Sequence, residues 1–171
     1  GGIMNNISAR LLWQDPETLE LFPWLATALP EISADATEFT FTLRQGVTYS
    51  DGSPLTAANV AKNFDLFGRG DESRTLPVSE QISNYDRAEV LDDRRVRFHF
   101  TAPSPGFAQA TSTMNAGLLA DSTLDLDAEG FGPGSATKIH TAGPFRITAE
   151  TIGTKLSIRA REDYDWAAAA P

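Results

Sequence analysis

A seven-residue run with strict alternation constrains the fold of this chain more than any other part of its sequence. Glu38–Arg44 reads EFTFTLR, so Phe39, Phe41 and Leu43 fall on one side of an extended backbone and polar residues fall on the other. Alternation with period two in aromatic and β-branched residues is typical of a half-buried β-strand. The run therefore predicts a sheet with one apolar face that other parts of the chain must cover.

The segment after this strand predicts a tight turn and a helix. Residues 50–54 read SDGSP, a cluster of turn-forming residues, and Thr56 is suited to cap a helix. Apolar residues then recur at helical spacing, at positions 57, 60, 61, 64 and 67. Such a stripe needs a partner surface. We expect a helix over about residues 56–67 that packs on the sheet and ends at Gly68 and Gly70.

Two hairpins are predicted downstream. Residues 89–91 and 96–100 alternate around one turn, and residues 144–148 and 155–160 do so around another. The run ISARLLW near the N-terminus fits either a helical turn or a strand. Together these patterns predict an α+β fold with mixed, largely antiparallel β-sheets and a few helices.

Composition excludes several classes of protein. The 171 residues carry 14 Lys and Arg against 23 Asp and Glu, a formal net charge of −9. Because that charge repels phosphate groups, we expect no nucleic-acid partner and no attraction to an anionic membrane surface. The chain has no cysteine, which excludes thiolate catalysis and cysteine–zinc sites. No leader or membrane-spanning segment is predicted within this sequence.

No catalytic or metal-binding pattern stands out. His99 alternates with arginines on the polar side of a predicted strand, where we expect a solvated side chain. Residues 125–130 resemble the start of a calcium loop, but Ala136 stands where the bidentate glutamate belongs. Residues 132–138 lack the glycine that directly precedes lysine in a phosphate loop. We expect no catalytic residue, no metal and no cofactor.

The three tryptophans leave two interpretations open. They form either an exposed platform for a ligand or part of the core. Trp24 is expected to pack under the turn at Pro23, whereas Trp13 and Trp166 fit either interpretation.

The order of several motifs is more specific than any single site pattern. Residues 38–64 read EFTFTLRQGVTYSDGSPLTAANVAKNF, after Leu25-Ala26 and Ala28-Leu29. The blocks VLDD with VRF follow within residues 90–98, and AGPFRI follows at 142–147. This order resembles the signature region of the family 5 extracellular solute-binding proteins, which are oligopeptide-, dipeptide- and nickel-binding receptors of ABC importers.

The resemblance implies a fold and a division into parts. The family's receptors are much longer and have two lobes around a cleft, so we expect residues 1–171 to be a fragment of the first lobe. The implied fold is part of the first lobe of a type II periplasmic-binding-protein-like structure. Residues 30–140 would form a β-rich subdomain, and residues 1–29 with 141–171 would supply segments of the ligand-binding subdomain. A fragment of this kind would expose apolar surface, which favours self-association.

The resemblance also implies a function in ligand binding rather than in catalysis. Such a receptor captures a peptide or a similar small solute outside the cytoplasm, in the periplasm or lipid-anchored on the outer face of the cell membrane. It delivers the solute to the membrane permease of an ABC importer and is not an enzyme. Two alternatives stay open, a ligand-sensing module of a cytoplasmic transcription regulator and a free-standing interaction domain.

Two short segments are the candidates for the cleft wall that this resemblance implies. The first holds Asn5 and Asn6, and the second holds Met114 and Asn115. Amide side chains suit a peptide backbone because each one both donates and accepts hydrogen bonds. We therefore expect these residues to bind the ligand.

Overall fold

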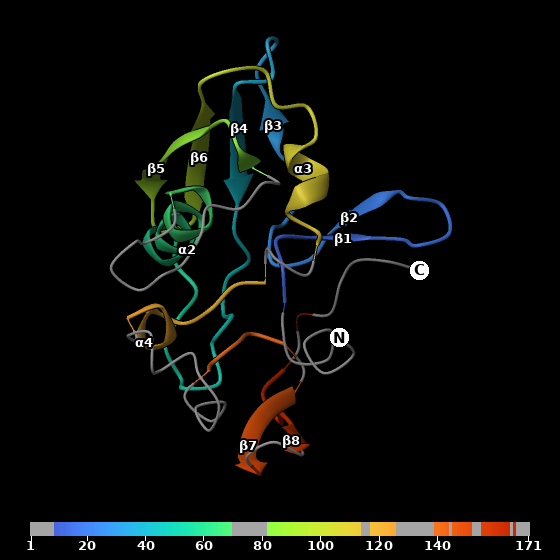
Figure 1. The fold of residues 1–171 in the computed structure, drawn as a ribbon, viewed down its shortest axis with the longest axis vertical. Helices are drawn as coiled ribbons and strands as arrows, with labels where there is room; N and C mark the ends of the chain where they lie inside the picture. Colours follow the sequence, from blue (N-terminus) through green and yellow to red (C-terminus); the bar gives the residue numbers. More distant parts are fainter. Residues whose placement is uncertain are drawn as a thin grey trace.

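The computed structural model describes residues 9–69, 82–113, 117–125, 139–143, 145–151, 155–164 and 166. Its largest sheet is antiparallel and is built from four strands (Figure 1). In spatial order they are β3 (Glu31–Ile32), β4 (Glu38–Thr42), β6 (Arg95–Phe100) and β5 (Tyr85–Asp92). The sheet confirms the strand expected from the EFTFTLR run and the first expected hairpin.

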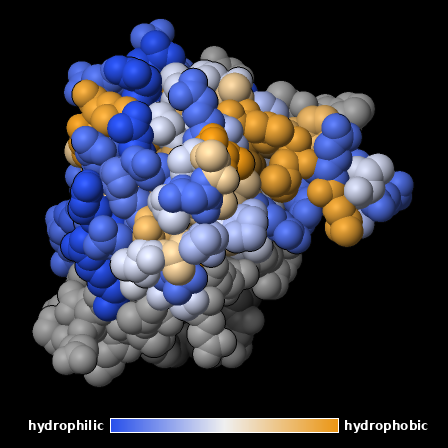
Figure 2. Space-filling view, turned by 90° about the horizontal axis from the view of Figure 1, so that it is seen from above, coloured by the Kyte–Doolittle hydropathy of each residue, from blue (hydrophilic) through white to orange (hydrophobic). Residues whose placement is uncertain are grey.

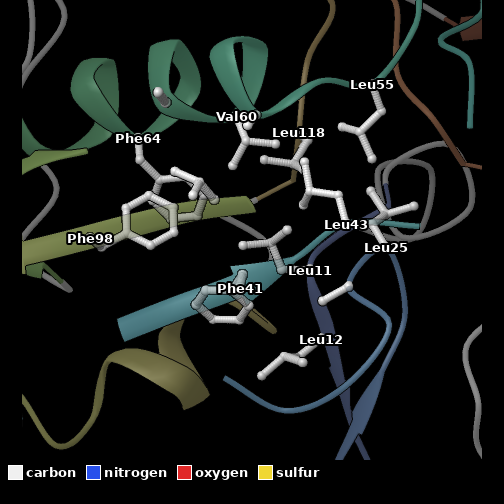
Figure 3. Close-up of a cluster of buried hydrophobic side chains, with 14 of the residues drawn as sticks. Leu11, Leu12, Leu25, Phe41, Leu43, Leu55, Val60, Phe64, Phe98 and Leu118 are labelled. Atoms are coloured by element: carbon white, nitrogen blue, oxygen red, sulfur yellow. The ribbon is translucent and has the colours of Figure 1, made fainter. Parts of the chain in front are cut away.

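The apolar face of this sheet is the centre of the core. Phe39 and Phe41 are fully buried, and they pair in register with Phe98 and Val96 of β6. The helix α2 (Ala57–Arg69) lies over this face. Figure 3 shows side chains of the helix and of the sheet pointing toward one another between the two layers. The predicted packing of the helix on the sheet is therefore confirmed.

Phe107 joins this core from a helix of four residues, α3 (Phe107–Ala110). Its ring centre lies 4.7 Å from that of Phe100 and 5.1 Å from those of Phe39 and Phe98. Aromatic rings at such distances in tilted or edge-to-face geometry contribute beyond the area that they bury. Residues far apart in the sequence thus meet around one ring.

Local hydrogen bonds explain where α2 begins. Gly52 has a φ of +87°, which glycine adopts without strain, and its N–H donates to the carbonyl of Tyr49 over 2.9 Å. The hydroxyl of Thr56 accepts from the N–H of Asn59 over 3.1 Å, as a helix cap does. The expected turn and the expected cap are both confirmed.

The helix ends two residues later than expected. α2 runs through Gly68 to Arg69, so Gly68 lies in the last turn of the helix, and Gly70 lies outside the described residues. A Cβ atom on Gly68 would lie closer than 3.0 Å to carbons of the Tyr85 side chain. Gly68 therefore allows the side chain of Tyr85, at the start of β5, to approach the helix closely.

The remaining elements are short. β1 (Leu12–Gln14) pairs with β2 (Leu21–Pro23), and β7 (Phe145–Thr151) pairs with β8 (Lys155–Ala160). The second pair confirms the second expected hairpin, and β1 decides the ISARLLW ambiguity in favour of a strand for its last residues. α4 (Asp121–Leu124) lies beside α2. None of the helices in the described ranges is long and apolar enough to cross a bilayer.

Hydrophobic surface is uneven over the molecule. Seen from above, most of it gathers toward the side on which the β1–β2 hairpin projects, and the opposite side is mainly hydrophilic apart from one smaller hydrophobic patch (Figure 2). Four large hydrophobic side chains in the described residues are exposed, and they are Leu19, Leu29, Ile32 and Val90.

Candidate functional site

The four residues expected to bind the ligand, Asn5, Asn6, Met114 and Asn115, lie outside the described residues. The described residues that flank these two segments in the chain do contact each other. The Nε–H of Arg10 donates to the carbonyl of Thr113, 103 positions further along the chain. The N–H of Leu118 donates to the carbonyl of Ala9 over 3.0 Å. The chain neighbours of the two candidate segments are thus brought together.

Arg10 is the unusual residue at this meeting point. It is only 5% exposed, and its Nη2 atom is the one buried side-chain nitrogen or oxygen of the described residues that lacks a hydrogen-bond partner. Burial lowers the pKa of the guanidinium, because an apolar surrounding disfavours the charged form. Sequence patterns give no sign of this, since a single arginine beside a strand has no recognisable motif.

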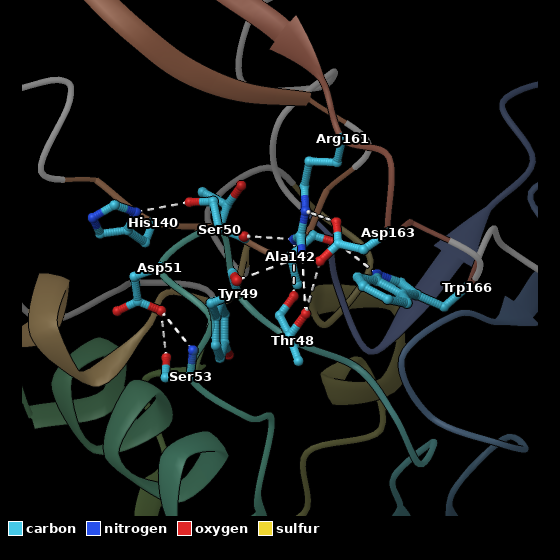
Figure 4. Close-up of polar contacts among 11 residues, drawn as sticks. Thr48, Tyr49, Ser50, Asp51, Ser53, His140, Ala142, Arg161, Asp163 and Trp166 are labelled. Carbon is cyan, nitrogen blue, oxygen red and sulfur yellow. Dashed lines mark hydrogen bonds and ion pairs between the residues drawn. The ribbon is translucent and has the colours of Figure 1, made fainter.

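A second buried arginine, Arg161, has its hydrogen-bond donors engaged. Its side chain is 3% exposed and donates to the carbonyl of Thr48 over 2.8 Å and to that of Thr141 over 3.3 Å. Its Nε and Nη2 atoms each lie 2.9 Å from the carboxylate of Asp163. These bonds hold the pKa of Asp163 below its usual value. Figure 4 shows the guanidinium at the centre of these contacts.

A cavity of about 370 Å³ opens beside this arginine. It is lined by Tyr49, Ser50, Gly52, Ala160, Arg161, Glu162 and Asp163. The guanidinium at its edge is already engaged by protein acceptors, so it has little capacity left for a ligand. The arrangement therefore acts as a junction that fastens the end of β8 to the turn before α2.

A serine and a histidine also meet near this cavity. The Oγ atom of Ser50 lies 2.8 Å from Nδ1 of His140, 90 positions further along the chain (Figure 4). The neighbouring carboxylate of Asp51 is engaged by Ser53 and Ser122. In the described residues no carboxylate bonds to His140, so the third group that orients a catalytic histidine is lacking. This contact joins the turn at residues 50–53 to the segment around His140.

The expectation of a solvated His99 is wrong. Its side chain is 16% exposed and lies between two glutamates, with Nε2 2.9 Å from Glu89 and Nδ1 3.5 Å from Glu38. The hydrogen bond from His99 lowers the pKa of Glu89. Pairing of β4, β5 and β6 brings the three residues together on the outer face of the sheet.

The tryptophans belong to the interior rather than to a platform. Trp24 and Trp166 are buried, and the indole N–H of Trp24 donates to the hydroxyl of Tyr164 over 3.2 Å. Trp13 is half-buried against Phe22. The expected burial of Trp24 is confirmed, and Trp166 is part of the core rather than of an exposed platform.

The described residues hold no cluster of His, Asp or Glu that could bind a metal ion. Asp125 is the one described residue of the calcium-like run 125–130. Its carboxylate pairs with Lys62. Among the described residues, Arg10 thus stands out as a buried guanidinium with one unpaired nitrogen.

Comparison with solved structures shows which known architecture this fold has. NikZ from Campylobacter jejuni, solved in complex with Ni(L-His), matches 94% of this chain with 31% of its own, at 22% identity and a TM-score of 0.79. DppA from Helicobacter pylori, solved with the peptide STSA, matches 94% with 34% of its own, at 22% identity and a TM-score of 0.74. The architecture is therefore that of the solute-binding proteins with a periplasmic-binding-protein fold.

The family follows from the sequence itself. The profile described as bacterial extracellular solute-binding proteins, family 5 (middle region), matches residues 20–171, and the chain belongs to that family. Protein XP55 of Streptomyces lividans is 33% identical over 159 residues, which are 90% of this chain and 27% of that protein. The resemblance inferred from the motif order and the expected fold class are both confirmed. The chain spans about a quarter to a third of the length of these relatives.

Proposed function

We propose that this chain forms part of the first lobe of a receptor that captures a peptide or a similar small solute outside the cytoplasm. The receptor passes the solute to the membrane permease of an ABC importer. The observation that carries the proposal is the family match over residues 20–171. It is supported by solved proteins of the same fold whose ligands are a peptide and a nickel–histidine complex.

In this proposal the cleft wall lies around the contact between Arg10 and Thr113. The hydrogen bond between them joins the neighbourhoods of Asn5 and Asn6 on one side and of Met114 on the other. Residues 30–140 act as the β-rich subdomain, and residues 1–29 with 141–171 belong to the ligand-binding subdomain. Binding without bond breaking is the role of the chain, and closure of two lobes on the ligand completes capture.

Titration of the ¹⁵N-labelled chain with a panel of small solutes tests this function. The panel holds di- to tetrapeptides and the nickel–histidine complex, and chemical shifts report binding even in the millimolar range. We expect saturable shifts at Thr113 and its neighbours for at least one class. The exposed variant Arg95→Met, on the outer face of the sheet, should respond as the unchanged chain does. If no member of the panel shifts any resonance, the proposed function is wrong.

A further inference from the structure

Arg10 differs from every other buried polar side chain of the described residues. Its Nε–H donates to the carbonyl of Thr113, but Nη2 is enclosed and has no hydrogen-bond partner. None of the described carboxylates forms an ion pair with it. A guanidinium offers five N–H donors, so the two on Nη2 are left without an acceptor.

The comparison with Arg161 shows that the chain satisfies a buried guanidinium elsewhere. That side chain is as deeply enclosed, yet its donors bond to backbone carbonyls, a hydroxyl and a carboxylate. Leaving buried donors unpaired costs free energy, and an unpaired buried charge costs more. The unpaired donors of Arg10 therefore suit an acceptor that arrives with the ligand.

The position of Arg10 agrees with this requirement. Its hydrogen bond to Thr113 spans the two stretches of chain on either side of the proposed cleft wall. The net charge of −9 does not attract an anion to the chain, and salt screens it beyond about 8 Å. Recognition of an anion must therefore come from a local cation that is shielded from water.

We propose that Arg10 binds a carboxylate of the captured solute through its free Nη2 donors. The inference rests on the proposed function and names the chemical group that the first lobe recognises. Every peptide with a free C-terminus carries this group. A charge-assisted hydrogen bond from a guanidinium to a carboxylate is roughly twice as strong as a neutral one.

Two small peptides that differ in one group serve as probes. Glycylglycine carries a carboxylate, and glycylglycinamide is of nearly the same size without it. The Nε–Hε resonance of Arg10 in the ¹⁵N-labelled chain is followed during titration with each. We expect glycylglycine to shift this resonance in a saturable way and the amide to bind at least about tenfold more weakly, a difference of about 1.4 kcal/mol.

Variants separate the role of charge from that of shape. Arg10→Met removes the cation and should weaken glycylglycine binding at least about tenfold. Arg10→Lys keeps the charge without the Nη2 donors and should bind with intermediate affinity. Arg95→Met removes one positive charge from the exposed face of β6 and should leave binding unchanged. If Arg10→Met does not fold, the lysine variant and the resonance of the unchanged chain decide the question.

The outcomes distinguish this inference from the function on which it rests. If both peptides bind equally, or if glycylglycine leaves the Arg10 resonance unmoved, the inference is wrong even when other solutes bind. A carboxylate supplied by another part of the protein would give that result as well, since added glycylglycine would then find no open donor. If no solute of the wider panel binds, the proposed function fails too.

Discussion

The guanidinium of Arg161 lies 5.1 Å from the ring centre of Trp166 and caps the buried indole. The indole N–H donates to the carbonyl of Ala142 over 2.6 Å. One residue after β8 and one near the C-terminus thus close a junction on the segment around Thr48. This pair fixes how the end of the chain meets the turn before α2.

Replacing Arg161 should therefore destabilise the fold. Arg161→Met removes the guanidinium donor from the carbonyl of Thr48, whereas the carbonyl of Thr141 still accepts from the N–H of Ser50. A buried group that loses its partner costs about 1–3 kcal/mol. Asp163→Asn serves as the control, because that carboxylate is 63% exposed and an exposed ion pair contributes about 0–1 kcal/mol. Urea unfolding followed by tryptophan fluorescence measures both. Equal losses for the two variants would show that the junction is only an exposed ion pair.

Phe107 should be among the most sensitive positions of the core. Because its ring contacts those of Phe39, Phe98 and Phe100, Phe107→Ala should cost about 3–5 kcal/mol of unfolding free energy, as Phe41→Ala should. Val90→Ala at an exposed position of β5 should change it by less than about 0.5 kcal/mol. A loss below about 1 kcal/mol for Phe107→Ala would mean that α3 does not close the core.

Gly68→Ala should destabilise α2 although alanine is the better helix former. Helix propensity alone favours alanine by about 1 kcal/mol, but the new Cβ meets the Tyr85 side chain, and overpacking costs about 1–3 kcal/mol. Gly106→Ala is the matched control, since no heavy atom lies within 4 Å of the position that its Cβ would occupy and its φ is −84°. Thermal unfolding of both variants checks this, and a higher melting temperature for Gly68→Ala would contradict it.

The fold should be most stable between mildly acidic and mildly alkaline pH. Hydrogen bonds from neighbouring side chains lower the pKa of Glu89, Asp92 and Asp163. Their contribution is present above the unfolded pKa of about 4 and is lost as pH falls through the folded values. Burial raises the pKa of Tyr49 and Tyr85, so stability falls again as pH rises above about 10. Melting temperatures measured across this range should form a plateau with two shoulders, and a steady rise from acid to about pH 11 would contradict these assignments.

The 171-residue chain by itself should bind peptides only weakly. A binding cleft encloses most of its ligand, and the chain spans 31–34% of the solved relatives. A receptor that binds at about 1 μM gains roughly 8 kcal/mol, and half of that gain corresponds to a dissociation constant near about 1 mM. Calorimetry against a mixed peptide library measures this. Saturable binding at low micromolar concentration would mean that the complete site lies within these residues.

Local patterns predicted the central part of the fold. They did not predict features that depend on contacts between residues far apart in the sequence. The β4 alternation and the stripe of α2 specify their elements because the periodicity lies within a few residues. The two residues of β3 form a strand only because Ile32 pairs with Phe39, and no pattern fits in two residues. The role of Gly68 in α2 was missed because the ring that comes close to it belongs to Tyr85 of β5.

The candidate site was less accessible to sequence reasoning for the same physical reason. The amide residues proposed from the sequence are chain neighbours of Arg10 and Thr113, but the contact between these two joins positions 103 residues apart. The pairing of His99 with Glu89 likewise depends on the register of two strands. Contacts of this kind follow from the fold and leave no trace in local spacing.

The central place of Phe107 has a consequence for the order in which the chain can fold during synthesis. β4 is made early, but its partner strand β6 and the ring that closes the core come from residues 95–107. A growing chain therefore carries the uncovered Phe39 and Phe41 until those residues have left the ribosome. Because the core can assemble only after these distant segments exist, the chain exposes apolar surface of a kind that promotes aggregation until residues 95–107 are made.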